Sequence, residues 1–301
     1  MIMHRKLFIA VMAVVGGIAV VTSCSEQPNN VRNSESRPQI SENFETLLDS
    51  LVVSIPDGPL SDADRRVLSE RRKEQHQAEA KLRELGTNVL PQLMQKVEAL
   101  GRVEATNRAA ARVDTRRLAR AFEILGDKAI PLLPMLTNEL HRGQSIGPSM
   151  AGLVGIGGSQ AGLALIPELT NSDSTIRNWT MSALSYFSTN REVVAVAVPL
   201  VLPYLHDDSA FTRSLTANLL GQFHTNAEAV LPQLAELAEH DQDIVVRISA
   251  IKSIGRFGTN AASMKAVLEK IAATSQEQSI RSMTYNALQA ARGEIPPDAI
   301  R

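Results

Sequence analysis

The feature that most constrains the fold of this chain is an amphipathic segment that recurs at a nearly fixed period. Its clearest copy is DIVVRISAIKSIGRFG, residues 243–258, and the arginine in it, Arg247, has counterparts at Arg177, Arg213 and Arg281. The successive arginines are 36, 34 and 34 residues apart. A period of this size is typical of stacked helix pairs, each of which buries its apolar face against its neighbour. The repeat therefore predicts an all-α fold, an α/α superhelix or solenoid.

Fixed residue types follow three of the arginines, Arg177, Arg213 and Arg247, and they predict how one unit packs on the next. A small residue comes three positions later, an aliphatic residue seven later and a phenylalanine ten later, as in Ala250, Ile254 and Phe257. We expect the small residue to let the neighbouring backbone approach and the aliphatic residue to fill the shared core. Gly221 and Gly255, eight positions after their arginines, lower helix propensity and are expected where helices pack tightly.

Polar residues at the edges of the segment predict where its helices begin. An aspartate stands four positions before two of the arginines, at Asp173 and Asp243. We expect it to cap the first helix of the unit and to form an ion pair with the arginine four residues later. A Thr-Asn pair follows the phenylalanine in three copies, and its asparagine is expected to cap the second helix.

The repeat pattern also divides the chain into parts. Seven units are counted over residues 61–292, regular from Asp173 onward and weaker before it, with only a first helix in the last unit. Residues 41–60 have apolar positions at helical spacing followed by prolines, and are expected to form an N-terminal capping helix and loop. Gly86 is expected to end the first long helix. Residues 293–301 contain two adjacent prolines and are expected to be a disordered, non-helical tail.

The motif D-x-x-x-R-x-x-A-x-x-x-I-G at residues 243–255 resembles the HEAT-repeat superfamily, which has an armadillo-type fold. It is most similar to the short form shared with phycobilisome-lyase-type repeat proteins. The resemblance covers residues 61–292 and implies about seven HEAT-like helix pairs. Leu118 and Gly147 stand where the second and third units would have their arginine, so the motif is interrupted there. The residues with which the family's enzymes attach or detach bilins find no match, so the resemblance implies no lyase activity.

The first 24 residues resemble a bacterial lipoprotein signal. A basic segment, residues 1–6, precedes an apolar run of 15 residues from Leu7 to Val21, and Thr22-Ser23-Cys24 ends it. The run is shorter than the ~20 residues that span a bilayer. The resemblance implies that residues 1–23 are a cleaved signal peptide and that Cys24 is lipidated. It also implies a membrane anchor facing the periplasm, at the outer rather than the inner membrane.

An uncleaved membrane anchor and an ordinary secretory signal are the alternatives for this segment. Cys24 is the only cysteine, so no disulfide forms within the chain. Residues 24–40 are polar apart from a few positions and contain two prolines, and they are expected to be a flexible tether.

Composition and the spacing of reactive side chains favour no catalytic site. The formal net charge is −1, which offers no overall attraction for nucleic acid. The six histidines show no metal-ligand spacing, and no serine lies in a nucleophile-elbow context. The glycine-rich residues 152–158 lack the strand and the lysine of a phosphate-binding loop, and are interpreted as a repeat turn or a joint in the superhelix. We therefore expect no enzyme, no cofactor and no metal site.

Two surfaces are candidates for binding. Arg108, Arg112, Arg116 and Arg120 are spaced four residues apart and form one stripe on a helix, which would dock an acidic partner or an anionic lipid headgroup. The alternative is a solvated face paired with acids of neighbouring helices. The concave face is the second candidate. It is expected to be lined by the second helices, with Tyr204 either an interface anchor or part of the repeat packing.

The leading hypothesis is a membrane-anchored, non-enzymatic scaffold that binds another, unidentified protein through a face of the solenoid. Two alternatives stay open. One is an enzyme or ligand-binding protein with a site in the superhelix groove, and the other is a purely structural envelope spacer.

Overall fold

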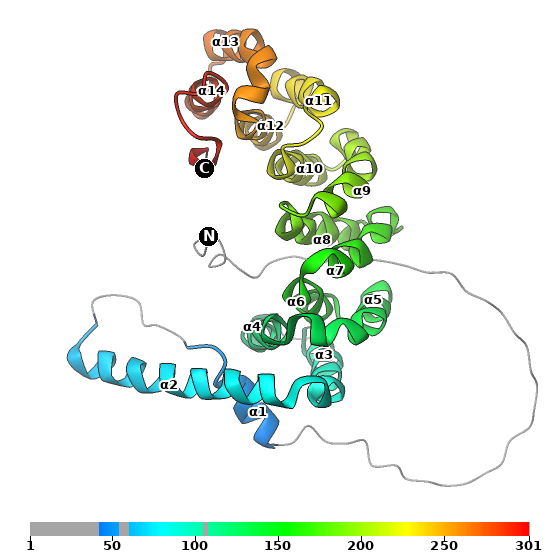
Figure 1. Ribbon diagram of the computed structural model, residues 1–301. Helices are drawn as coiled ribbons and strands as arrows, with labels where there is room; N and C mark the ends of the chain where they lie inside the picture. The colour runs from blue at the N-terminus through cyan, green and yellow to red at the C-terminus, as the bar shows by residue number, and fades with distance from the viewer. Residues whose placement is uncertain (1–41, 54–59, 105–107, 301) are drawn as a thin grey trace, which may run out of the picture. The chain divides into compact units, whose positions relative to one another are not determined.

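The computed structural model describes residues 42–53, 60–104 and 108–300. These residues form fourteen α-helices and seven short 3₁₀ segments, with no strand among them. The predicted all-α solenoid is confirmed (Figure 1). No helix in these ranges is long and apolar enough to cross a membrane. The signal peptide, Cys24 and the tether lie outside the described residues.

The chain divides into two compact units, with the boundary between Gly157 and Gly158. Unit 1 contains α1 (Glu42–Asp49), α2 (Asp62–Leu85), α3 (Leu90–Glu104), α4 (Arg108–Leu125), α5 (Leu133–His141) and α6 (Ile146–Ile156), with 3₁₀ segments η1 (Gly86–Val89) and η2 (Gly126–Leu132). Unit 2 contains the α-helices α7 (Gly158–Leu165), α8 (Ser174–Leu184), α9 (Arg191–Val201), α10 (Ala210–Phe223), α11 (Ala227–His240), α12 (Ile244–Arg256), α13 (Lys265–Thr274) and α14 (Gln278–Ala291). Its 3₁₀ segments are η3 (Ile166–Thr170), η4 (Ser185–Phe187), η5 (Leu202–His206), η6 (Gly258–Met264) and η7 (Pro297–Ala299).

In unit 1, α1 covers the first helices of the stack. Phe44 and Leu48 of α1 are buried, and α1 packs against α2 and α4. Lys96 of α3 reaches across to Glu45 of α1 at 2.8 Å and to Asp114 of α4 at 3.2 Å. The helix lies in the segment where a capping helix was expected, and its apolar face is fully used in this contact.

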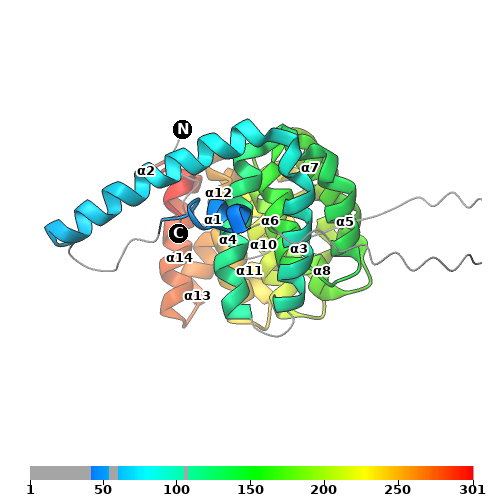
Figure 2. The same ribbon diagram turned by 90° about the horizontal axis from the view of Figure 1, so that it is seen from below.

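The 24-residue helix α2 ends at Gly86 as the sequence predicts, and Ser61 caps its start. The Asp64 amide donates to Ser61 Oγ, and the Ser61 amide donates in return to the Asp64 carboxylate, which forms a capping box. Gly86 ends the helix with a φ of 54°. Leu68 is the buried residue of its first part, and its other buried residues lie near the C-terminal end. Figure 2 shows the first part of α2 extending beyond α1 and α4.

The glycines of α6 serve close helix packing in unit 1. A Cβ on Gly152 would lie 2.9 Å from Leu136, and one on Gly155 would lie 2.7 Å from the carbonyl oxygen of Ala119. Helix α6 therefore packs with almost no space between its backbone and α4. The glycine-rich run that superficially suggests a phosphate loop is explained by this contact and by the turn at Gly157, where φ is 68°.

In unit 2 the first helices of the repeats, α8, α10, α12 and α14, pack directly against one another. The second helices are α9, α11 and α13, and Figure 1 shows the first helices on the inner side of the curve that this unit follows. The prediction that second helices line the concave face is therefore wrong for this unit. The physical reason is the small residues of the first helices. A Cβ on Gly221 would lie 2.5 Å from Ser253 Cβ, so α10 and α12 approach closely and the unit bends toward them.

The residue types that follow each arginine fill the core as predicted. Thr216 is fully buried, and its hydroxyl donates to the carbonyl oxygen of Thr212 at 2.8 Å, so burial leaves the hydroxyl satisfied. The aliphatic residues and phenylalanines of the repeat are buried throughout unit 2: Leu184, Leu220, Ile254, Phe187, Phe223 and Phe257.

The repeated arginines bind the turn before their helix rather than its capping aspartate. Asp173 and Asp243 cap α8 and α12 as predicted, each accepting a backbone amide at 2.7 Å. The predicted ion pairs with the arginines four residues later are wrong, because these carboxylates face the helix amides. Nη1 of three arginines donates instead to the carbonyls six and five residues earlier, with Arg177 on Asn171 and Ser172, Arg213 on Asp207 and Asp208, and Arg281 on Ser275 and Gln276. Each arginine thereby satisfies carbonyls that no helix uses.

The Thr-Asn pair caps the second helix in one copy of three. Asn190 accepts the amide of Val193 at 3.2 Å and begins α9 as predicted. Asn226 precedes α11 with a φ of 53° and no side-chain hydrogen bond to the helix. Asn260 lies inside η6. Asn226 is at the N-cap position of α11 but has a left-handed backbone instead of the extended one that Asn190 has, and Asn260 lies within the 3₁₀ segment that precedes α13.

The tail is structured as far as residue 300, contrary to expectation. The segment η7 begins at Pro297, the second of the two prolines, because a proline in the first turn of a helix loses no hydrogen bond. Ile300 is buried, and it lies close to the Cβ position of Gly255 on α12. An apolar side chain near the chain end therefore holds the tail on the last repeats.

Candidate functional site

The arginine stripe on α4 divides into a structural part and an exposed part. Arg120 pairs with Glu79 of α2, and Arg117 beside the stripe pairs with Asp49 of α1 at 2.9 Å. Burial opposes the ionisation of Glu79, but hydrogen bonds and charge from Arg120 and Arg83 together lower its pKa. Arg120 therefore joins α4 to α2. At this end of the stripe the arginine is paired with an acid of a neighbouring helix, which was the alternative to a binding surface.

Arg112 and Arg116 form the exposed part of the stripe. Both side chains are exposed, and neither has an acidic partner among the described residues. Val113 between them is 51% exposed. The Arg108 side chain lies outside the described residues. Unit 1 thus presents two cations and an apolar residue to solvent on α4.

Tyr204, the aromatic residue proposed as an anchor, is engaged within the solenoid. It lies in η5, and its hydroxyl donates to the carbonyl oxygen of Leu169 at 2.6 Å. The guanidinium of Arg177 lies 5.6 Å from its ring centre, a cation–π distance. These contacts join consecutive repeats, so the structure places Tyr204 in the repeat packing.

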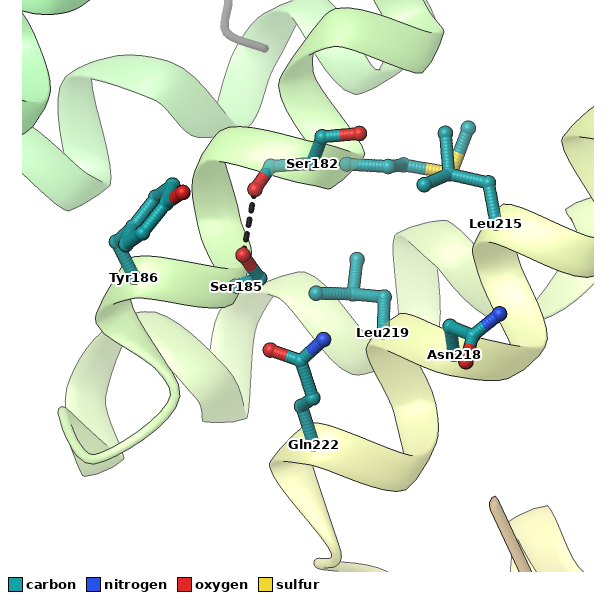
Figure 3. Close-up of a pocket in the computed structure, with 8 residues that line it drawn as sticks. Ser182, Ser185, Tyr186, Leu215, Asn218, Leu219 and Gln222 are labelled. Carbon is teal, nitrogen blue, oxygen red and sulfur yellow. Dashed lines mark hydrogen bonds between the residues drawn. The ribbon is translucent and has the colours of Figure 1, made fainter. Parts of the chain in front are cut away.

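A pocket of about 160 Å³ lies between α8 and α10 (Figure 3). Its walls combine apolar, hydroxyl, amide and phenol groups, from Met181, Ser182, Ser185, Tyr186, Leu215, Asn218, Leu219 and Gln222. Figure 3 shows Ser182 and Ser185 of the first repeat across from Asn218 and Gln222 of the next. Tyr186 is 37% exposed. The helices that form the pocket, α8 and α10, lie on the inner side of the curve of unit 2 (Figure 1).

Two cations lie on α12, the helix that packs against the pocket helix α10. Lys252 and Arg256 lie one turn apart on α12, and Arg256 Nη1 donates to the carbonyl oxygen of the pocket residue Asn218 at 3.4 Å. Among the described residues neither cation forms an ion pair with a carboxylate. Burial lowers the pKa of both groups, and the charge of Arg256 lowers that of Lys252 further. Unit 2 thus holds two like charges half-buried beside polar groups.

These residues occupy equivalent positions in successive repeats. Five and nine positions after the repeat arginine stand Ser182 of α8 and Tyr186 of η4, Asn218 and Gln222 of α10, and Lys252 and Arg256 of α12. We call these six residues the inner row. Sequence reasoning passed over it, although the signal was present. In these three copies the row is polar at positions that neither the core nor a cap requires, and in one of them it is charged.

The inner row offers hydrogen-bonding amides and hydroxyls and two positive charges. Within the described ranges, no cluster of histidine, cysteine, aspartate and glutamate side chains is arranged to hold a metal ion.

The family model of HEAT repeats matches residues 162–255 and, in an overlapping match, residues 198–289. Together the two matches cover residues 162–289, so this part of the chain is similar to HEAT repeats. The match concerns HEAT repeats in general and does not distinguish the phycobilisome-lyase-type form. No curated protein matched the chain. Among solved structures, a crystal structure of an engineered protein from a structural genomics consortium is similar in fold, with 16% identity and a TM-score of 0.40. The alignment covers 84% of this chain and 98% of that one, but so weak a likeness has no bearing on function.

Proposed function

We propose that this protein is a HEAT-repeat scaffold that binds another protein through the inner face of unit 2. The observation that carries this proposal is the pair Lys252 and Arg256, two cations without an acidic partner among the described residues, beside the open pocket at Asn218. HEAT repeats support a role in protein interaction because stacked repeats offer long continuous surfaces.

The energetics of the pair favour a binding role. Half-burying a cation costs hydration free energy that a neighbouring carboxylate normally offsets. Two like charges four residues apart on a helix also repel by a few tenths of a kcal/mol. Both the loss of hydration and the like-charge repulsion apply to Lys252 and Arg256, and no carboxylate contact within the described residues offsets them. An acidic group supplied by a partner would offset them.

The size of the pocket favours a protein side chain over a whole small molecule. Pockets that bind drug-sized ligands measure roughly 300–1,000 Å³. The pocket between α8 and α10 measures about 160 Å³, and its α10 wall carries two side-chain amides that match a peptide backbone. It therefore suits one inserted side chain of a larger partner.

The position of the scaffold follows from its N-terminus in this proposal. Lipidated Cys24 would hold the chain at a bacterial membrane on the periplasmic side, and a polar tether of about 16 residues would keep the body within roughly 20–25 Å of the surface on average. Mass spectrometry of the mature N-terminus tests the anchor. A diacylated or triacylated Cys24 supports it, whereas an unmodified Cys24 or a retained Met1 rejects it.

Affinity purification of the tethered chain after crosslinking in intact cells tests the scaffold role. We expect a defined partner in near-stoichiometric amount. Recovery of no partner from anchored protein would contradict the scaffold and favour a structural spacer. Turnover of a small molecule by the purified chain would favour an enzyme with its site in the groove.

A further inference from the structure

We infer that the inner row binds an extended acidic segment of the partner protein, with an apolar side chain in the pocket between α8 and α10 and carboxylates on Lys252 and Arg256. The inference rests on the proposed scaffold function and adds the chemistry of what the scaffold recognises.

The charge of the row selects an anion. Lys252 and Arg256 lie on one face of α12, and the described residues supply no carboxylate to either. Arg256 uses Nη1 in one long hydrogen bond to a carbonyl oxygen, at 3.4 Å, so the other donors of its guanidinium are available. A guanidinium and an ammonium side by side suit carboxylates, which accept hydrogen bonds from both.

The free groups of the pocket select a peptide. The side-chain amide of Gln222 makes no hydrogen bond within the described residues, so it offers both a donor and an acceptor, as a peptide group requires. Asn218 is already held by Ser214 and Ser249 and keeps a fixed orientation beside it. Met181 and Leu219 give the pocket an apolar part that suits a single aliphatic side chain.

The spacing of the helices sets the length of the segment. Packed helices lie about 8–10 Å apart, so the row from α8 to α12 spans roughly 16–20 Å. An extended chain advances about 3.3 Å per residue and covers that span with about six residues. The pocket lies between α8 and α10 and the cations lie on α12. The apolar residue and the acidic residues should therefore be about three or four positions apart.

The number of cations disfavours other anions. Clusters of roughly 4–8 lysines and arginines are typical of contact with anionic lipids, and a protein that grips nucleic acid commonly neutralises about 6–10 phosphates. The inner row has two cations. It is suited to a short segment with a few carboxylates.

Selection from a displayed library of random nonapeptides on the full chain tests the inference, with a photo-crosslinking residue in place of Gln222 as a reporter of location. We expect selected peptides to carry two or more Asp or Glu residues three or four positions from a Leu, Ile, Met or Val. The variant Lys252→Gln/Arg256→Gln should bind them at least tenfold more weakly. The control variant Arg191→Gln/Lys265→Gln, with the same charge change on second helices, should bind them normally.

Salt gives a second measurement that needs no variant. The affinity of the unchanged protein for a selected acidic peptide should fall as ionic strength rises, since partly exposed charge pairs are screened. Peptides that crosslink at position 222 without acidic preference, or that bind the Lys252→Gln/Arg256→Gln variant normally, would overturn the inference and leave the scaffold function standing. Tighter binding of single-stranded DNA or anionic vesicles through the same pair would overturn it as well. If no peptide crosslinks at position 222, the inference fails, and partner recovery from cells decides the scaffold function separately.

Discussion

Arg213 of one repeat grips Asp241 at the start of the next with two parallel hydrogen bonds, Nε to Oδ2 at 2.7 Å and Nη2 to Oδ1 at 2.9 Å. The same guanidinium also donates to the carbonyl of Asp207 at 2.8 Å. The Asp241 side chain is 4% exposed. The Arg213 side chain thus bonds both the turn before its own helix and the turn before the next first helix. This bidentate ion pair therefore links consecutive repeats with a defined geometry.

Replacing Asp241 by Asn should destabilise unit 2 by about 1–3 kcal/mol, because the charged acceptor is lost while Arg213 stays partly buried. Urea unfolding followed by circular dichroism measures the effect. The matched control is Asp208→Asn, which removes the same charge from an exposed side chain and leaves the backbone carbonyl in place. Equal midpoints for the two variants would show that the pair contributes no stability.

The same pair predicts how stability depends on pH. The hydrogen bonds from Arg213 hold the pKa of Asp241 below its ordinary value of about 3.9. Because the folded-state pKa is depressed, the stabilisation is fully present above the unfolded pKa and is lost as pH falls through the folded pKa, from about pH 5 downward. Unfolding measured across this range should show a shallower acid loss in the Asp241→Asn variant. A loss as steep as that of the unchanged protein would assign it to other carboxylates.

Replacing Gly221 by Ala should destabilise the protein although alanine favours helices by about 1 kcal/mol. The new Cβ would lie 2.5 Å from both Cβ and Oγ of Ser253 and 2.7 Å from its Cα, so α10 and α12 must separate. We expect a net loss of about 1–3 kcal/mol. Ser282→Ala on the exposed face of α14 is the control and should be neutral or slightly stabilising. Thermal unfolding of the two variants decides, and a Gly221→Ala protein as stable as the control would mean that the helices are not in close contact.

The fold was predictable because the same residue types recur at the same offsets from the repeated arginine. The period of the arginines indicates stacked helix pairs, and the buried Phe257 and Ile254 appear where spacing predicts them. The partner of each arginine was not predictable. Asp243 stands one helical turn from Arg247, but its carboxylate accepts the amide of Val245 instead. Sequence spacing shows that the aspartate and the arginine are near each other. It does not show that the unpaired backbone amides at the helix start compete with the arginine for the aspartate carboxylate.

The candidate site was harder to predict for a different reason. Arg112 and Arg120 look equivalent in the stripe, yet Arg120 pairs with Glu79, which is 41 residues away, and Arg112 is exposed. Likewise, Lys252 and Arg256 are candidate binding residues only because no carboxylate of the described residues pairs with them. Whether a charge is neutralised depends on contacts distant in sequence, and a single sequence does not display them.

The long helix α2 should be stable at one end and open easily at the other. Its buried residues Ala78, Glu79 and Leu82 lie near the C-terminal end, whereas Val67 in the first part is 54% exposed. Since protection follows burial and tertiary contact, amides of residues 66–76 should exchange faster than those of residues 79–85. Hydrogen exchange with mass spectrometry resolves the two segments. Uniform strong protection along α2 would indicate that another surface covers its first part.

Site-specific photo-crosslinking in intact cells tests the central claim most directly, namely that the inner face of unit 2 binds the partner. A photo-reactive residue replaces Gln222 on the pocket wall in one strain and Arg191 on the exposed second helix α9 in another. We predict a single dominant protein adduct of defined mass from position 222 and none from position 191. No adduct at position 222, or the same adducts at both positions, would contradict the account.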